Sequence, residues 1–292
     1  MIDVKLITFI NVVQLKNFTR AAEVLNLTQP AVTQHIKLLE EYYGVNLIKK
    51  KGRQFFLTEE GEILFQYAKE LKVSAALIER KLRNQSAVAK QYVIGATLTI
   101  GEFVLPPLLG EYKKLHENID IIMQVSNMNG ITNKLMNGEI DLAIVEGPFD
   151  RSKFKYKKFK DDELALVVSS ESDFAKRLSI GLDEIINGHL ILREKGSSTR
   201  AVFENKLTEK GYNLAELKTY MEIGSIGAIK SLVKANLGYT IISKIAIKQE
   251  VENEILHIIP IDGVKIMREF NFLYVNHSPE DFIDSFICFL TH

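Results

Sequence analysis

The chain has 292 residues, of which 46% are apolar and 25% charged, a composition that excludes a disordered or fibrous protein and fits a folded globular one. Its formal net charge is zero, yet residues 1–90 hold 14 Lys and Arg against 9 Asp and Glu, so the remaining residues are acidic by the same margin. We therefore expect a basic amino-terminal module joined to a mildly acidic body, in a chain long enough for two or three domains.

The single cysteine, Cys288, excludes an intrachain disulfide and suits a reducing compartment. It stands beside Phe286 and Phe289, where we expect a small buried side chain. The first apolar run has no basic residues ahead of it and no small-residue cleavage site, and no run approaches about 20 apolar residues. These features predict a cytoplasmic protein.

Three helices are expected at the amino terminus. Apolar residues recur at helical spacing between Val4 and Leu15, and FTRAAEVLNL predicts a short second helix capped by Thr19. Thr28 then caps a third helix with Pro30 in its first turn, where a missing N–H costs nothing.

The third helix is expected to have an apolar and a polar face. Val32, Ile36 and Leu39 face inward, and the opposite side bears Gln29, Pro30, Thr33, Gln34 and Lys37. Two short helices around a tight turn, the second with a polar outer face, predict a helix-turn-helix. Glutamine amides at the amino end of such a helix can bond an adenine edge in the major groove.

The segment VNLIKKKGRQFFLT predicts a two-stranded wing with Gly52 at its tip. Phe55 and Leu57 alternate inward, and the basic residues near the tip would bind phosphate or the minor groove: Lys49, Lys50, Lys51 and Arg53. A polar helix face or a KKKGR loop alone is more often plain solvated surface, but together and in this order the pieces favour DNA binding.

A long helix is predicted to follow from residue 59, capped by Thr58. Its apolar residues step by four and three, as in a coiled-coil seam: Leu64, Ala68, Leu71, Ala75, Ile78 and Leu82. This spacing predicts a homodimer whose two reading heads match a palindrome. The alternative is a helix packed on its own domain.

These residues closely resemble the LysR-type family of bacterial transcriptional regulators. The resemblance lies in FTRAAEVLNLTQPAVTQHIKLLEEYYGVNL and LTEEGEILFQYA, across about the first 90 residues. It implies a winged helix-turn-helix in which DNA faces Thr28, Gln29, Pro30, Ala31, Thr33, Gln34 and Lys37, with Arg20 and Arg53 at phosphate or the minor groove. The family commonly has Phe and Arg where this chain has Ile48 and Lys50, and a lysine keeps the charge but loses the arginine fork.

Beyond a polar hinge at residues 85–90, strand and helix patterns alternate to residue 292, which predicts α/β structure with parallel sheets. Two sets of strands suggest two lobes with a ligand cleft between them. The segments NGEIDLAIVEGP and ANLGYTIISKIAI resemble the family's effector-binding half, which is similar to periplasmic solute-binding proteins. We expect crossovers near residues 161–163 and 264–269.

The expected fold is therefore an α/β chain with a winged, helical amino-terminal module. The winged helix-turn-helix spans residues 1–58, the dimerisation helix 59–84, the hinge 85–90 and the effector domain 91–292. Lobe I takes about 91–162 and 269–292, and lobe II about 163–268.

Loops that open helices are expected to line the cleft. ATLTIG, SNMNG, KGSSTR and the start of the helix at residue 225 offer hydroxyls and free N–H groups suited to an anion. The candidate effector residues are Thr97, Thr99, Ile100, Gly101, Ser126, Asn127, Ser197, Ser198, Thr199, Arg200, Gly224 and Ser225. Plain N-capping is the alternative at KGSSTR. The spelling REKGSSTR resembles the subgroup of regulators linked to sulfur or carbon assimilation.

No catalytic signature is found in the sequence: HExxH, a Cys cluster, GxSxG and a P-loop are absent, and the six histidines are scattered. We therefore expect a regulator that is not an enzyme and needs no cofactor or metal. Its expected partners are promoter DNA, a small anionic effector, RNA polymerase and copies of itself, as a dimer or a tetramer. The alternative is a small-molecule receptor without DNA function.

Overall fold

The computed structural model describes residues 2–51, 54–86 and 89–291. The chain divides into two compact units, residues 1–87 and 88–292, each described here by itself. No helix in the described ranges has the length and apolar content needed to cross a membrane.

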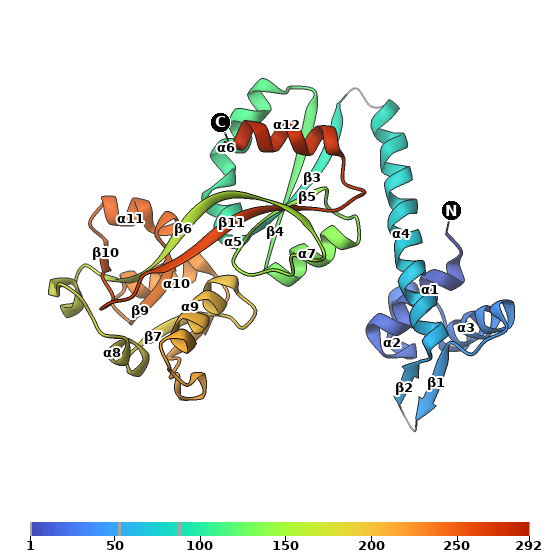
Figure 1. The fold of residues 1–292 in the computed structure, drawn as a ribbon, viewed down its shortest axis with the longest axis horizontal. Helices are drawn as coiled ribbons and strands as arrows, with labels where there is room; N and C mark the ends of the chain where they lie inside the picture. The colour runs from blue at the N-terminus through green and yellow to red at the C-terminus, as the bar shows by residue number, and fades with distance from the viewer. Residues whose placement is uncertain (1, 52–53, 87–88, 292) are drawn as a thin grey trace. The chain divides into compact units, whose positions relative to one another are not determined.

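The amino-terminal unit is a winged helix-turn-helix followed by a long helix (Figure 1). Its elements are α1 (Val4–Leu15), α2 (Phe18–Leu25), α3 (Gln29–Tyr43), β1 (Ile48–Lys51), β2 (Gln54–Leu57) and α4 (Glu59–Ser86). The predicted inward residues of α3 and the residues Phe9, Ile10 and Leu47 meet in one buried cluster. The two wing strands are antiparallel, and Phe55 and Leu57 are half-buried as their alternation predicts.

Capping residues set the helix starts in this unit. Thr28 accepts a hydrogen bond from the Ala31 N–H at the start of α3, as predicted. The prediction for α2 is wrong: Asn17 is the N-cap and accepts from the Arg20 N–H, so Thr19 lies inside the helix. Both residue types cap well, and Asn17 stands two residues earlier.

The carboxy-terminal unit contains two lobes that share one continuous sheet. Lobe I consists of β3 (Lys90–Thr97), α5 (Leu98–Phe103), α6 (Leu105–Leu115), β4 (Ile119–Ser126), α7 (Met128–Met136), β5 (Leu142–Glu146) and α12 (Glu280–Thr291). Lobe II consists of η1 (Asp173–Lys176), α8 (Leu182–Asn187), β7 (Leu190–Arg193), α9 (Ser198–Glu209), η2 (Leu214–Glu216), β8 (Met221–Ile223), α10 (Ile226–Lys234), β9 (Tyr239–Ser243), η3 (Lys244–Ile247), α11 (Lys248–Glu252) and β10 (Leu256–Ile259).

Two long strands, β6 (Lys155–Ser169) and β11 (Ile266–Tyr274), run side by side through both lobes (Figure 1). The strand order is β4-β3-β5-β11-β6-β9-β7-β8, and β10 also pairs with β6. Within each lobe the other strands are parallel, whereas β11 is antiparallel to β5 and β6. The lobes therefore meet where Asp162 of β6 pairs with Arg268 of β11.

Each lobe buries a separate apolar core on each face of its part of the sheet. In lobe I, α5, α6 and α12 cover one face and α7 the other. In lobe II, α8 and α9 cover one face and α10 and α11 the other. The expectation for Cys288 is wrong: it lies on the exposed side of α12, while its neighbour Phe286 is fully buried. An amphipathic helix turns by 100° per residue, so a position two residues from a core residue can face solvent.

Candidate nucleic-acid interface and effector site

The polar side of α3 is a continuous exposed surface at the amino end of the helix. Thr28, Gln29, Pro30, Gln34 and Lys37 are exposed, as is Arg20 on α2, while Ala31 and Thr33 are half-buried. The Gln29 amide donates to Thr33 Oγ1 at 3.0 Å, and the Thr33 hydroxyl donates to the Gln29 carbonyl at 3.1 Å. These bonds hold the amide in place while leaving its oxygen available for a base edge.

One hydrogen bond that the sequence analysis missed fixes α3 on α1. The Thr8 hydroxyl donates to the Val4 carbonyl at 2.9 Å, and His35 Nδ1 lies 2.9 Å from the same Thr8 oxygen. Because the Thr8 proton is already used on a carbonyl, His35 Nδ1 must donate. Thr8 is fully buried, so the bond anchors the recognition helix to the core of the unit.

Of the basic residues predicted on the wing, only Lys49 has a side chain in the described part of the chain. Lys49 on β1 is exposed. Lys50 also lies in β1, but its side chain, like the whole of Arg53, is outside the part of the chain that the structure describes. Thr58 closes the wing because its hydroxyl donates to the Asn46 carbonyl at 2.6 Å and accepts from the Gly61 N–H at 2.9 Å.

The predicted seam of α4 divides into two parts. Leu64 and Ala68 pack into the core of their own unit, as the alternative interpretation expected. Leu71, Ile78 and Leu82 are more than half exposed. A row of large exposed apolar side chains on a long helix is a surface that a second copy of the helix can cover.

A buried ionic network lies where the two lobes meet. The Arg268 side chain is only 1% exposed, and its Nε donates to Asp162 at 2.7 Å. Asp162 also accepts from the Ser243 hydroxyl at 2.7 Å, and a second carboxylate, Glu146, lies 3.7 Å from Arg268 Nη1. A single guanidinium thus faces two buried carboxylates at the crossover.

Arg268 also bonds one threonine from each lobe. Its Nη2 donates to Thr99 of α5 at 3.2 Å, and its Nη1 donates to Thr199 of α9 at 3.0 Å. Thr97, at the start of α5, donates to Glu146. The structure therefore brings Thr97, Thr99 and Thr199, predicted from two distant loops, into one network around Arg268.

The amino end of α9 is buried without a cap. Ser197 occupies the N-cap position, but its hydroxyl makes no capping bond, and the residue is 3% exposed. Ser198, Thr199 and Arg200 follow and are also buried, and their N–H groups have no hydrogen-bond partner in the described part of the chain. Free N–H groups at a helix amino end attract an anion. Plain N-capping therefore does not explain Ser197.

The remaining predicted residues have other contacts. Arg200 is paired with Glu204 and Glu222, each at 2.6 Å, so its guanidinium is already neutralised. These ion pairs raise the pKa of Arg200 against the opposing effect of burial. Asn127 and Ser225 cap α7 and α10.

Of the last four predicted positions, Ile100 and Gly101 serve packing. Ile100 belongs to the buried core of lobe I, and a Cβ on Gly101 would lie 2.6 Å from Val125 Cγ2, so only glycine fits there. Ser126 is half-buried at the end of β4, and Gly224 is exposed before α10.

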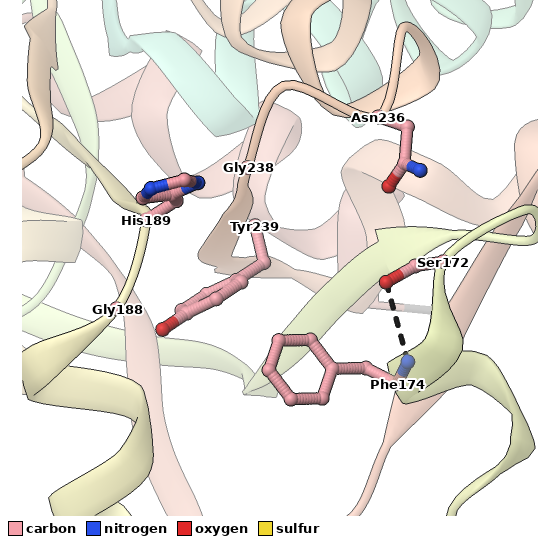
Figure 2. A pocket seen from close by; sticks show the side chains of 7 residues that line it. All are labelled: Ser172, Phe174, Gly188, His189, Asn236, Gly238 and Tyr239. Carbon is pink, nitrogen blue, oxygen red and sulfur yellow. Dashed lines mark hydrogen bonds between the residues drawn. The ribbon is translucent and has the colours of Figure 1, made fainter.

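A separate hollow of about 280 Å³ lies in lobe II, at the opposite end of β7 and β9 from the crossover network (Figure 2). It is lined by Ser172, Phe174, Gly188, His189, Asn236, Gly238 and Tyr239, and it contains none of the predicted effector residues. The Tyr239 hydroxyl donates to the Ile185 carbonyl at 2.9 Å, and burial raises the pKa of Tyr239 to about 12. The hollow lies before β7 and β9, whereas the crossover network lies after them.

Comparison with known proteins gives matches along the chain. The family of bacterial regulatory helix-turn-helix proteins of the lysR type matches residues 4–62, and the LysR substrate binding domain matches residues 85–291. The HTH-type transcriptional regulator CysL of Bacillus subtilis is 28% identical, over 93% of this chain and 89% of its own. A probable RuBisCO transcriptional regulator of Emiliania huxleyi is 34% identical, over 88% of this chain and 83% of its own.

Among solved structures, the regulatory domain of CcmR from Synechocystis, in complex with 2-PG, has the same fold as the carboxy-terminal unit. It covers 68% of this chain and 96% of its own, with a TM-score of 0.61 and 24% identity.

Proposed function

The chain belongs to the LysR family of DNA-binding transcriptional regulators, and we propose that a small anionic effector bound between its lobes controls its promoter binding. One observation carries this proposal: at the buried amino end of α9, the first N–H groups and the Ser197 hydroxyl have no hydrogen-bond partner among the described residues. An anion there would accept hydrogen bonds from these N–H groups and from the Ser197 hydroxyl.

The comparisons support the chemistry of the effector. CcmR, whose regulatory domain shares this fold, is found in complex with 2-PG. The similarity to a probable RuBisCO regulator and to CysL favours a regulator of carbon or sulfur assimilation. We infer that the effector is an acidic metabolite of such a pathway.

Arg268 couples effector binding to the arrangement of the two lobes. It bonds Thr99 of lobe I and Thr199 of lobe II, so an anion beside Thr199 acts on a contact that joins the lobes. The effector shifts the protein between two lobe arrangements only by its difference in affinity for them. In our proposal this difference reaches DNA through α4, alters DNA bending and changes recruitment of RNA polymerase.

On the DNA side, the exposed amino end of α3 reads bases and the wing binds phosphate. The protein pairs through the exposed residues of α4 as a homodimer, and two dimers pair again into a tetramer. A promoter-binding protein acts where the chromosome is, so we place it in the cytoplasm at the nucleoid. A receptor without DNA function would not need the lysR-type helix-turn-helix, and we propose neither catalysis nor a cofactor.

The effector site is tested by a thermal-shift screen of the full chain with acetate, malonate, sulfate, phosphate and 2-PG. A bound anion raises the melting temperature by mass action. Ser197→Ala should keep the stability of the protein, because no cap is lost, yet weaken anion binding by on the order of 10-fold.

Ser172→Ala is the matched control, because Ser172 accepts the Phe174 N–H and lies in the other hollow. It should leave anion binding unchanged. If Ser172→Ala weakened anion binding and Ser197→Ala did not, the effector would bind in the lobe II hollow and the proposal would be wrong.

A further inference from the structure

Lys160 is a half-buried cation without an ion pair. Its Nζ lies 5.2 Å from the ring centre of Phe159 and 5.7 Å from that of Phe270, and in the described chain no carboxylate is within ion-pairing distance. Burial lowers the pKa of Lys160, while the charge of Asp162 acts the other way. Removing an ammonium group from water costs free energy, and contacts with aromatic rings return only about 0.5–2 kcal/mol of it.

A β-bulge beside Lys160 brings Phe159 to the same face of the sheet as the lysine side chain. Phe270 of β11 pairs with Lys160, but Asn271 pairs with Lys158, so Phe159 is an extra residue in β6. A bulge interrupts the alternation of a strand and re-aims a side chain. Phe159 thus packs against Phe272, with 4.9 Å between ring centres, and Lys160 lies over Phe270, the residue two positions away on the same face of β11, although neighbouring residues of a regular strand point to opposite faces.

The face to which Lys160 is aimed is the face of the crossover network. Residues directly opposite each other in antiparallel strands share a face, and Phe270 stands opposite Lys160 on one side and Glu146 on the other. The Arg268 guanidinium lies over the same Phe270 ring at 5.5 Å. A chain of contacts therefore runs from Thr199 at the amino end of α9 through Arg268 and Phe270 to Lys160.

The cations on this face differ in whether a carboxylate already neutralises them. Arg268 already faces two carboxylates, Asp162 and Glu146, and Arg200 faces Glu204 and Glu222. Lys160 is the cation on the face whose charge no carboxylate neutralises in the described chain. An acid group could therefore bind the Lys160 ammonium without breaking an ion pair within the protein.

We infer that Lys160 binds the second acid group of a dianionic effector whose first acid group lies at the amino end of α9. This inference rests on the proposed anion site and narrows its ligand class to short dicarboxylates and phosphorylated carboxylates. A ligand with a single acid group can bind only the N–H groups at the amino end of α9. A ligand needs a second acid group to bind the Lys160 ammonium as well.

The test compares matched anions on the full-length protein. Acetate and malonate differ by one carboxylate, and their dissociation constants are measured by calorimetry for the wild type, Lys160→Met and Lys160→Arg. Lys160→Met should weaken malonate binding on the order of 10–100-fold, as expected for a lost charge-assisted hydrogen bond, and leave the affinity for acetate nearly unchanged. Lys160→Arg keeps the charge and should retain most of the preference for malonate.

A structural role alone gives a different result. If Lys160 only packs against the phenylalanines, Lys160→Met keeps that packing, and the ratio of malonate to acetate affinity stays at the wild-type value. That result overturns the inference and leaves the anion site standing. If the wild type binds none of acetate, malonate, sulfate, phosphate and 2-PG, both the proposed site and the role of Lys160 fail. The melting temperature of each ligand-free variant shows whether it is folded, and Lys160→Met should melt no lower than the wild type.

Discussion

Arg268→Met is the substitution that tests the crossover network most severely. It keeps an unbranched apolar stem but leaves Asp162 and Glu146 buried without their guanidinium. Breaking a buried pair by removing one partner costs about 3–5 kcal/mol. In a unit of this size each kcal/mol lowers the melting temperature by about 2–4 °C, so we expect a fall of roughly 6–20 °C.

The assay is differential scanning calorimetry of the full chain, in which the two units can melt separately. Arg177→Met is the matched control, because Arg177 is also paired with a carboxylate, that of Glu184, but on the exposed surface. Its loss should cost less than about 1 kcal/mol. Equal falls in melting temperature for the two variants would refute the reasoning, since burial is what makes the Arg268 pair different.

Three further outcomes are expected. The Gln29→Ala protein should lose discrimination between promoter and random duplex, whereas Lys50→Ala should weaken binding to all DNA alike and reduce the slope of log affinity against log salt concentration by about one. Filter binding across a salt series separates the two effects. Equal loss of discrimination in both variants would contradict the division of roles. Leu71→Glu should shift the protein toward monomer in analytical ultracentrifugation, and an unchanged sedimentation coefficient would count against the α4 seam. Because the pKa of Tyr239 is raised to about 12, its contribution to stability is complete below about pH 10 and lost as the pH rises through 12. Tyr239→Phe should flatten that part of the stability curve, and an unchanged curve would show that another group titrates.

The helix-turn-helix could be predicted from sequence because its signals are local. Thr28, Pro30 and the spacing of Val32, Ile36 and Leu39 lie within a few turns of one helix, and the structure has the predicted cap and buried face. The error at α2 is also local: Asn17 and Thr19 are both good caps, and sequence alone did not decide between them.

The effector half was predictable as alternating strands and helices, but the full length of its crossing strand β6 (Lys155–Ser169) was not. Residues 155–162 are mostly lysine, aspartate and aromatic residues, which do not give the apolar run of a buried strand. Lobe I uses this segment at the edge of its sheet, where charged residues are tolerated and prevent unwanted pairing. At its other end the same strand pairs with the short strand β10.

The centre of the candidate site could not be predicted, because its residues meet only through the fold. Arg268 stands 106 residues from Asp162 and 169 from Thr99, and nothing in the local sequence marks it as buried. The threonines were predicted as free hydroxyls at helix starts, but Thr97 and Thr99 bond to Glu146 and Arg268. A bulge in β6 brings Phe159 beside Lys160, and bulges have no sequence signal in a strand without glycine.

The most direct test measures binding to the chain's own upstream DNA by fluorescence anisotropy, with and without the tightest-binding anion of the screen. The comparison uses wild-type protein and Ser197→Ala. Our proposal predicts that the anion changes the affinity or the protected length of DNA for the wild type, and that Ser197→Ala needs on the order of 10-fold more anion for the same change. An anion that binds the wild type yet leaves its DNA affinity and footprint unchanged would contradict the proposal.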